Sequence, residues 1–353
     1  MTLSDISIEP FRGDYEALER MAHASWRDEY GDASFPNFYK PAFLHYLFDR
    51  VKNRDHFLAA YRGEDIVGFL ANLPQRFHHR GVFYRAVYSC LLVSRKELLR
   101  RGLATALIEE ALRINEKHRY DFALLTLEAG HRSTKLMKKM AAAGRPLEWV
   151  KKIRVIARIL DLERVARSEG LKSWEKTAVR LIGGHRPPRP AEESCLRPYR
   201  SGDLDSCLGL LNRIKDTVRL ALVWEADDLA QELDCPGVAR TLVYEKEGRV
   251  AGLANFIQHD HIGRTVEKWA WLNHVAFPDL TPRERRRFVQ DFLRFIHREG
   301  FLGAIEWTKN YYSLKPFYNA RFFPYFRAVN LMSWPLGATV SLANIPDVYE
   351  IQV

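Results

Sequence analysis

An internal repeat is the sequence feature that most constrains the fold of this chain. Three short segments of the first half have similar counterparts in the second half, in the same order. The pairs are Pro10–Asp14 with Pro198–Asp203, Val67–Asn72 with Val250–Asn255, and His118-Arg119 with His297-Arg298, and the offset within each pair is nearly the same. One such pair is within the reach of chance, but three in sequence indicate a duplicated domain. We therefore expect two similar units rather than one large domain.

The segment between the two copies has the composition of a linker. Residues Gly183–Pro190 are rich in glycine and proline, which cannot continue a helix or a central strand. A length of 353 residues also favours two domains. We expect domains at residues 1–160 and 195–335, a helical bridge and proline-rich linker at 161–194, and a C-terminal tail at 336–353.

Both halves have the same expected order of elements. Short apolar runs bounded by turns predict strands, and apolar positions at helical spacing predict helices. In the first half the expected strands are Ile6–Glu9, Phe57–Tyr61, Ile66–Leu73, Val82–Val93, Phe122–Leu127 and Val150–Leu160, and the expected helices are Asp14–Trp26, Phe43–Val51, Leu98–Lys117 and Ser133–Ala143. This order predicts an α/β (α+β) fold with a mixed sheet and helices on both faces.

Composition and charge limit the possible partners. No apolar run reaches 18 residues, and residues 1–10 lack a basic segment followed by an apolar one, so we expect neither a membrane span nor a secretory signal. The formal net charge of +10 suits RNA, but the basic residues are spread along the whole chain. That spread favours an enzyme with a phosphate-bearing cofactor, and we do not expect a nucleic acid partner.

The cysteines and histidines do not predict a metal site. The four cysteines form no CxxC pair, which argues against a zinc site or a disulfide framework and favours a reducing, cytoplasmic location. His259 and His261 flank Asp260 in an expected hairpin turn, where we expect them to be exposed to solvent. No third ligand accompanies them, so we expect no metal.

The segment Cys90–Leu107 carries the clearest sign of chemistry. An apolar strand leads into a short basic loop and then into a helix whose first turn contains Gly102 and Ala104. The first amides of a helix have no intrahelical partner, and the helix dipole favours negative charge beside them. Small residues let a pyrophosphate approach this backbone closely, and Arg100 and Arg101 add positive charge. The segment therefore predicts a phosphate-binding site.

This segment resembles the signature of the GNAT superfamily of acyl-CoA-dependent N-acyltransferases, Gln/Arg-x-x-Gly-x-Gly/Ala. Gly102 and Ala104 fit the signature, whereas Leu99 stands where the family has Gln or Arg. The resemblance covers residues 6–160 and implies acetyl-CoA or a longer acyl-CoA as co-substrate. The residues implied to bind it are Arg100, Arg101, Gly102, Leu103, Ala104 and Thr105, together with Leu91, Leu92 and Val93, whose amides would polarise the thioester carbonyl at a bulge in the fourth strand.

The two halves differ in what they keep of the family pattern. The family often places a tyrosine, as general acid for the departing thiolate, on the helix after the fifth strand. Met140 holds that position in the first half and cannot donate a proton, whereas Tyr318 holds it in the second half. The second half has lost the phosphate motif, because Phe277–Arg287 contains no glycine and carries Asp279 and Glu284. We expect a degenerate second domain that shapes the acceptor pocket.

This division resembles the N-myristoyltransferase family, and tandem acetyltransferases share its general plan. Both groups are known for using the C-terminal carboxylate as a base, which implies that role for Val353; a disordered or surface-packed terminus is the alternative. Glu128, at the end of the fifth strand, is a second candidate base. Tyr84 and Tyr88 share the face of the fourth strand where acceptor-side residues usually sit, although aromatic residues in strands more often pack.

The leading hypothesis is an N-acyltransferase in which a primary amine, from a small molecule or a peptide, attacks the acyl-CoA directly. A second hypothesis is an aminoacyl-tRNA-dependent ligase of the peptidoglycan type, although no helical hairpin arm typical of that group is visible. A third is a non-catalytic regulator that binds acyl-CoA, which Met140 alone supports. Turnover of an amine panel distinguishes the first from the third, and a tRNA-dependent product would indicate the second.

Overall fold

The computed structural model describes residues 5–31, 33–128, 132–142, 144–181, 183, 185–188, 193–337 and 340–349. The first half contains β1 (Ser7–Pro10), α1 (Tyr15–Tyr30), β2 (Phe35–Pro36), α2 (Pro41–Phe48), β3 (Phe57–Arg62), β4 (Asp65–His79), β5 (Val82–Ser94), α3 (Leu103–Lys117), β6 (Phe122–Glu128), α4 (Arg132–Ala142) and β7 (Glu148–Ile159). Between the two halves lie α5 (Leu162–Glu169) and α6 (Ser173–Leu181).

The second half repeats this order. It contains β8 (Leu196–Pro198), α7 (Leu204–Asn212), β9 (Leu220–Leu222), α8 (Ala226–Leu233), β10 (Ala239–Lys246), β11 (Arg249–Ile262), β12 (Val266–Ala276), α9 (Pro282–Arg298), β13 (Gly303–Trp307), α10 (Lys315–Asn319), β14 (Phe323–Pro335) and β15 (Val348–Tyr349). The repeated segments occupy matching places: Pro10 and Pro198 end β1 and β8, and Asn72 and Asn255 are fully buried in β4 and β11. The expected fold of two tandem α/β units with a mixed sheet is confirmed.

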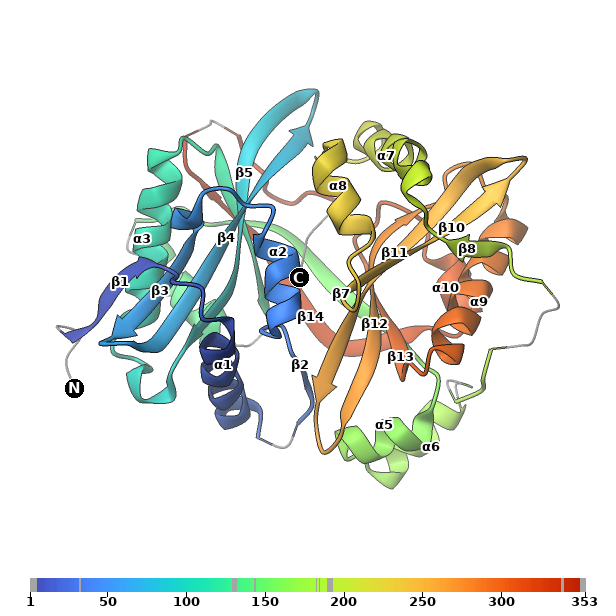
Figure 1. The fold of residues 1–353 in the computed structure, drawn as a ribbon, viewed down its shortest axis with the longest axis horizontal. Helices are drawn as coiled ribbons and strands as arrows, with labels where there is room; N and C mark the ends of the chain where they lie inside the picture. Colours follow the sequence, from blue (N-terminus) through green and yellow to red (C-terminus); the bar gives the residue numbers. More distant parts are fainter. Residues whose placement is uncertain are drawn as a thin grey trace.

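The last strand of each half is exchanged. In the sheet order β1-β3-β4-β5-β6-β14-β7-β13-β12-β11-β10-β8, β14 of the second half lies beside β6, and β7 of the first half lies beside β13. Figure 1 shows β7 and β14 crossing between the two halves. Each half is therefore completed by a strand of the other, while the boundaries at residues 160 and 195 remain a proposal from the sequence.

Two shorter strands are exchanged in the same way. β2 pairs with the end of β11, where Phe35 faces Ile262, and β9 pairs with the end of β4, where Leu222 faces Phe77. The added strand accompanies an extension of β4 to His79, past the expected end at Leu73. One buried apolar cluster consequently contains residues of both halves. None of the described helices is long and apolar enough to cross a membrane.

Candidate acyl-CoA site

The site lies where β5 and β6 separate. These strands pair in parallel only from Ala86 with Phe122 to Ser89 with Leu125, and beyond this point they diverge. Because successive side chains of a strand point to opposite faces, Leu125 and Leu127 face α3 whereas Thr126 and Glu128 face the other side of the sheet. The gap between the strands therefore connects the two faces of the sheet.

A bulge in β5 borders this gap. Phe69 pairs with Val93 and Ala71 pairs with Cys90, so Leu91 and Leu92 together face the single residue between Phe69 and Ala71. Leu91 has a φ of 56°, and its carbonyl oxygen accepts a hydrogen bond of 2.9 Å from the Tyr39 hydroxyl. A bulge leaves its extra residue outside the ladder. The backbone at Leu91 and Leu92 is thus in the place that the sequence predicts for a bulge.

The N-terminus of α3 has the geometry of an anion site. Arg100 has a φ of 63° and Gly102 a φ of 94°, so the chain turns sharply before the helix begins at Leu103, five residues later than expected. The first intrahelical hydrogen bond runs from the Ala106 amide to the Gly102 carbonyl, and no side chain caps the helix. The amides of residues 103–105 precede that bond and point toward the same end.

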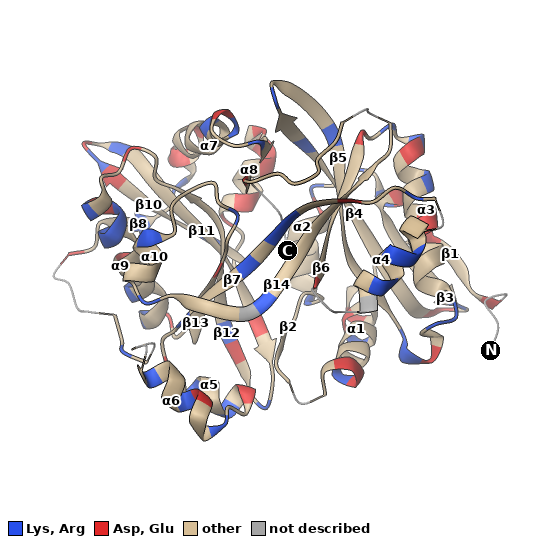
Figure 2. Cartoon of the chain, turned by 180° about the vertical axis from the view of Figure 1, so that it is seen from behind, with Lys and Arg blue, Asp and Glu red and all other residues tan. Residues whose placement is uncertain are grey.

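Basic side chains lie in the loop before this helix and on the neighbouring helix α4. Arg100 and Arg101 lie in the loop itself and are exposed. α4, whose Met137 packs in the same apolar cluster as Leu107 of α3, carries Lys135, Lys138 and Lys139. Figure 2 shows the positive charge of α4 beside α3. This surface is suited to a ligand with several phosphate groups.

A cavity of about 310 Å³ passes through the gap and has two lobes. The lobe on the α3 side, called here the apolar lobe, is lined by aliphatic side chains, one methionine and one tryptophan. Its residues are Leu70, Leu92, Ile108, Ala111, Leu112, Leu125, Leu127, Met137 and Trp334. No charged residue is among them. This lobe is suited to a hydrocarbon chain.

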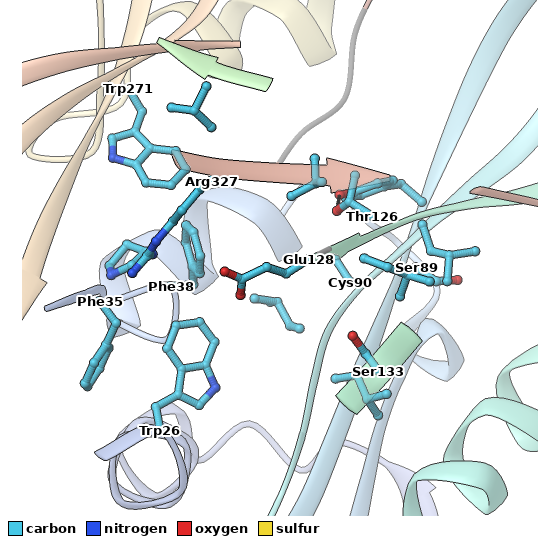
Figure 3. A pocket seen from close by; sticks show the side chains of 18 of the residues that line it. Trp26, Phe35, Phe38, Ser89, Cys90, Thr126, Glu128, Ser133, Trp271 and Arg327 are labelled. Carbon is cyan, nitrogen blue, oxygen red and sulfur yellow. Dashed lines mark hydrogen bonds between the residues drawn. The ribbon is translucent and has the colours of Figure 1, made fainter. Parts of the chain in front are cut away.

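The other lobe, called here the aromatic lobe, lies between the two halves. Its aromatic residues include Trp26, Tyr30, Phe35, Phe38 and Tyr39 from the first half and Trp269, Trp271, Trp307 and Tyr325 from the second. Three charged side chains also line it: Glu128, Glu169 and Arg327. Figure 3 shows the Glu128 carboxylate extending from the end of β6 into the space between Trp26, Phe38 and Arg327.

Burial and hydrogen bonds shift the pKa values of titratable side chains in the aromatic lobe. The Tyr30 hydroxyl donates a hydrogen bond of 3.1 Å to the Glu128 carboxylate, and burial together with this carboxylate raises the pKa of Tyr30 above its usual range. Burial also raises the pKa of Glu169 and lowers the pKa of His261 well below its ordinary value. Tyr30 and His261 are therefore both neutral at physiological pH.

Comparison with known proteins agrees with this geometry. Residues 13–127 match the family described as acetyltransferase (GNAT) domain. This range includes the β5 bulge, the N-terminus of α3 and the whole gap up to Leu127.

Residues 13–127 form a GNAT domain. No curated protein sequence matches the chain at a significant level. Among solved structures, two of Saccharomyces cerevisiae N-myristoyltransferase with bound myristoyl-CoA match with TM-scores of 0.79 and 0.77. They are 15% and 16% identical to this chain, and the matches cover 95% of it and 84% and 81% of those chains. The tandem arrangement of this protein thus resembles that of N-myristoyltransferase.

The second half differs from the GNAT domain at the helix that follows the bulged strand. Thr281 and Glu284 form a capping box at the start of α9, in which the Glu284 amide donates to the Thr281 hydroxyl and the Thr281 amide donates to the Glu284 carboxylate. Lys246 lies 2.8 Å from the same carboxylate. Because a carboxylate occupies the helix end, a pyrophosphate would meet like charge there.

The bulge of the second half is retained but covered. Asn273 and His274 of β12 together face the single residue Asn255. Leu91 and Leu92 likewise face one residue of β4 in the GNAT domain. Tyr349 of the tail is fully buried against them, with its hydroxyl 3.2 Å from His274 Nδ1 and accepting a hydrogen bond from the Trp224 indole. The tail therefore fills the place where the GNAT domain has its cavity.

The residues expected to carry catalysis lie in different places. Glu128 lines the cavity, whereas Tyr84 packs against Phe122 near the far end of β5 and is not among the cavity residues. Tyr318 is 46% exposed on α10, outside the cavity. Val353 lies outside the described residues. Of the candidates for acid or base, the structure therefore brings Glu128 to the gap, and Tyr88 lines it too.

The expectation for the two histidines was wrong. His259 and His261 belong to β11 and are buried, because Phe38 and Trp271 pack against their rings. Among the described residues, no group of three or more His, Cys, Asp or Glu side chains is placed to hold a metal.

Sequence reasoning missed most of the aromatic lobe. Glu169, Trp271 and Arg327 come from three elements that are distant in sequence, and only the strand exchange places them beside Glu128. The alternation of tryptophans at 269 and 271 was the one local signal that a face of β12 is buried.

Proposed function

We propose that this protein is an N-acyltransferase that moves an acyl group from acyl-CoA to a primary amine. The observation that carries the proposal is the cavity that crosses the sheet at the β5 bulge, beside an uncapped, basic helix end. The coenzyme pyrophosphate would bind the amides of residues 103–105, and the thioester would lie at Leu91 and Leu92. The amine would arrive through the aromatic lobe.

The apolar lobe supports an acyl group longer than acetyl. Its aliphatic lining extends from the bulge at Leu92 to Trp334, and burying methylene groups there gains about 0.8 kcal/mol each. The likeness to N-myristoyltransferase structures with bound myristoyl-CoA also supports a longer chain. Acetyl-CoA would fit the site but would leave most of this lobe empty.

The side chains at the gap favour direct attack of the amine on the acyl-CoA, without a covalent enzyme intermediate. Burial raises the pKa of the Cys90 thiol to about 12, so this cysteine is not a thiolate nucleophile at neutral pH. The amine nitrogen would bond to the acyl carbon, the carbon–sulfur bond would break, and the thiolate would leave as coenzyme A. Glu128 or the carboxylate of Val353 would take the proton from the amine.

Thiol release measured with acyl-CoAs of increasing length and a panel of primary amines tests this function. Ala111 is buried in the wall of the apolar lobe, so Ala111→Phe should lower kcat/KM for long acyl-CoAs and leave acetyl-CoA, the internal control, nearly unaffected. Titration should give one coenzyme A site per chain, because the second helix end is capped by Glu284. Binding without turnover of any amine would favour a regulator, and two equivalent sites would contradict a degenerate second half.

A further inference from the structure

A second bulge, in the exchanged strand β14, places a charged side chain in the aromatic lobe. Tyr325 pairs with Val155 and Ala328 pairs with Arg154, so residues 326 and 327 have no partner positions on β7. Bulges of this kind re-aim side chains and are common beside active sites. Arg327 consequently lines the same cavity as Glu128, and Figure 3 shows its side chain beside Phe38, on the opposite side of that ring from the Glu128 carboxylate.

Arg327 forms no ion pair within the described parts of the chain, although its charge acts on Glu169 and opposes the rise in pKa that burial causes at that carboxyl. Its guanidinium donates one hydrogen bond of 3.3 Å to the backbone oxygen of Ser34, and no described carboxylate forms an ion pair with it. A second donor, the Trp269 indole nitrogen, is buried in the same lobe without a hydrogen-bond partner. Removing such donors from water is unfavourable unless a ligand supplies acceptors.

The charged groups that face this position are Glu128, Glu169 and Arg327, with His261 beside them. Glu128 is held by the Tyr30 hydroxyl at the β6 side of the lobe. Burial raises the pKa of Glu169, and the hydrogen bond with Ser34 and the charge of Arg327 oppose this rise. The lobe thus offers a carboxylate for an ammonium group and, across from it, a guanidinium for an anion.

We propose that Arg327 binds a carboxylate of the acceptor, and that the acceptor is a free amino acid whose side chain packs against the aromatic residues. This inference rests on the proposed N-acyltransferase function. The amino group would lie at Glu128, lose its proton to the base and form the amide bond as the thiolate leaves, while the acceptor carboxylate stays unchanged on Arg327. A guanidinium matches a carboxylate with two parallel hydrogen bonds.

Matched acceptors test the assignment. Phenylalanine, phenylalaninamide and phenethylamine share the ring and the amine but differ in the carboxylate. With a long acyl-CoA, the parent protein should acylate phenylalanine with a kcat/KM about 10- to 100-fold higher than the other two, the range expected for a hydrogen bond to a charged group. Arg327→Gln should abolish that preference, mainly through KM, and Arg327→Lys should restore part of it.

The control is Arg154→Gln, which removes an exposed arginine from the strand beside β14 and should keep the parent's preference. Acyl-CoA affinity, measured by titration, checks that Arg327→Gln is folded. Equal rates for the three acceptors in the parent protein, or a preference that persists in Arg327→Gln, would overturn the role of Arg327 while the N-acyltransferase function stands. A peptide amine acylated far better than phenylalanine would also overturn it. No turnover of any amine would instead refute the proposed function.

Discussion

Three residues that shape the backbone around the candidate site have a positive φ. Leu91 turns the chain at the bulge, and Arg100 and Gly102 turn it before α3. A left-handed conformation costs a residue with a Cβ about 1–2 kcal/mol, so a side chain there needs support from its surroundings. At Leu91 part of this support is the hydrogen bond from the hydroxyl of Tyr39, which is buried.

Gly102→Glu should abolish coenzyme A binding. The substitution places a carboxylate at a helix end where the pyrophosphate is expected, and it fills the space that the phosphate needs for close approach. Gly102→Ala is the matched variant, because it carries the same backbone penalty at φ 94° without the charge and should keep more affinity. Isothermal titration with coenzyme A measures both. Parent-like affinity in Gly102→Glu would move the site elsewhere.

His259 should make the protein sensitive to acid. Burial lowers its pKa to about 3, so between about pH 6.5 and pH 3 the unfolded chain holds a proton that the folded chain lacks. The free energy of unfolding should therefore fall with decreasing pH below about 6.5, by as much as about 1.4 kcal/mol per unit, and should not depend on this group above pH 7.

Urea unfolding at pH 8, 6 and 5 checks this sign. His259→Phe, which keeps a ring among Phe38, Phe43 and Trp271, should reduce the loss of stability between pH 6 and pH 5. His297→Gln, at the exposed end of α9, is the control and should leave the loss as it is in the parent. An unchanged slope in His259→Phe would show that other groups govern the acid response.

At the scale of elements, the tail is a structural part that joins both halves. Leu342, Asn344 and Ile345 bond through their amides to the start of β7, and β15 then pairs with β9. Lys151 donates a hydrogen bond to the Pro346 carbonyl. The sequence predicted a C-terminal tail at residues 336–353 but not its path, because that path depends on partners from both halves.

Removing residues 351–353 should lower the turnover number while leaving the melting temperature and coenzyme affinity nearly unchanged. The buried anchor of the tail, Tyr349, is retained in this truncation. If Val353 supplies the base, the loss should be about 10²- to 10⁴-fold. C-terminal amidation, which removes one charge and keeps every side chain, should do similar harm. If both proteins turn over like the parent, the base lies elsewhere, and Glu128→Gln becomes the next variant to measure.

Local patterns predicted most elements of both halves but not how the halves join. Periodicity placed both ends of β6 and β7 within two residues and the start of α3 within five, and the glycine motif marked the uncapped end of α3. The strand exchange leaves no such local trace, since β7 has an ordinary apolar pattern whichever strand it pairs with. The aromatic lobe of the cavity, including Glu169 and Arg327, follows from that exchange and therefore could not be predicted.

At the scale of the whole molecule, the strand exchange should make each half depend on the other for folding, and a chain cut in the linker can test this. If the chain is cut between Pro188 and Glu193, the first fragment keeps β7 but loses both of its neighbours, β13 and β14, and β6 becomes an open sheet edge. Exposed edges of this kind favour aggregation. We expect each fragment alone to be insoluble or unfolded by circular dichroism, and the two coexpressed fragments to form one complex that binds coenzyme A once. A first fragment that folds alone and binds coenzyme A with parent affinity would show that the GNAT domain does not depend on the strand it receives.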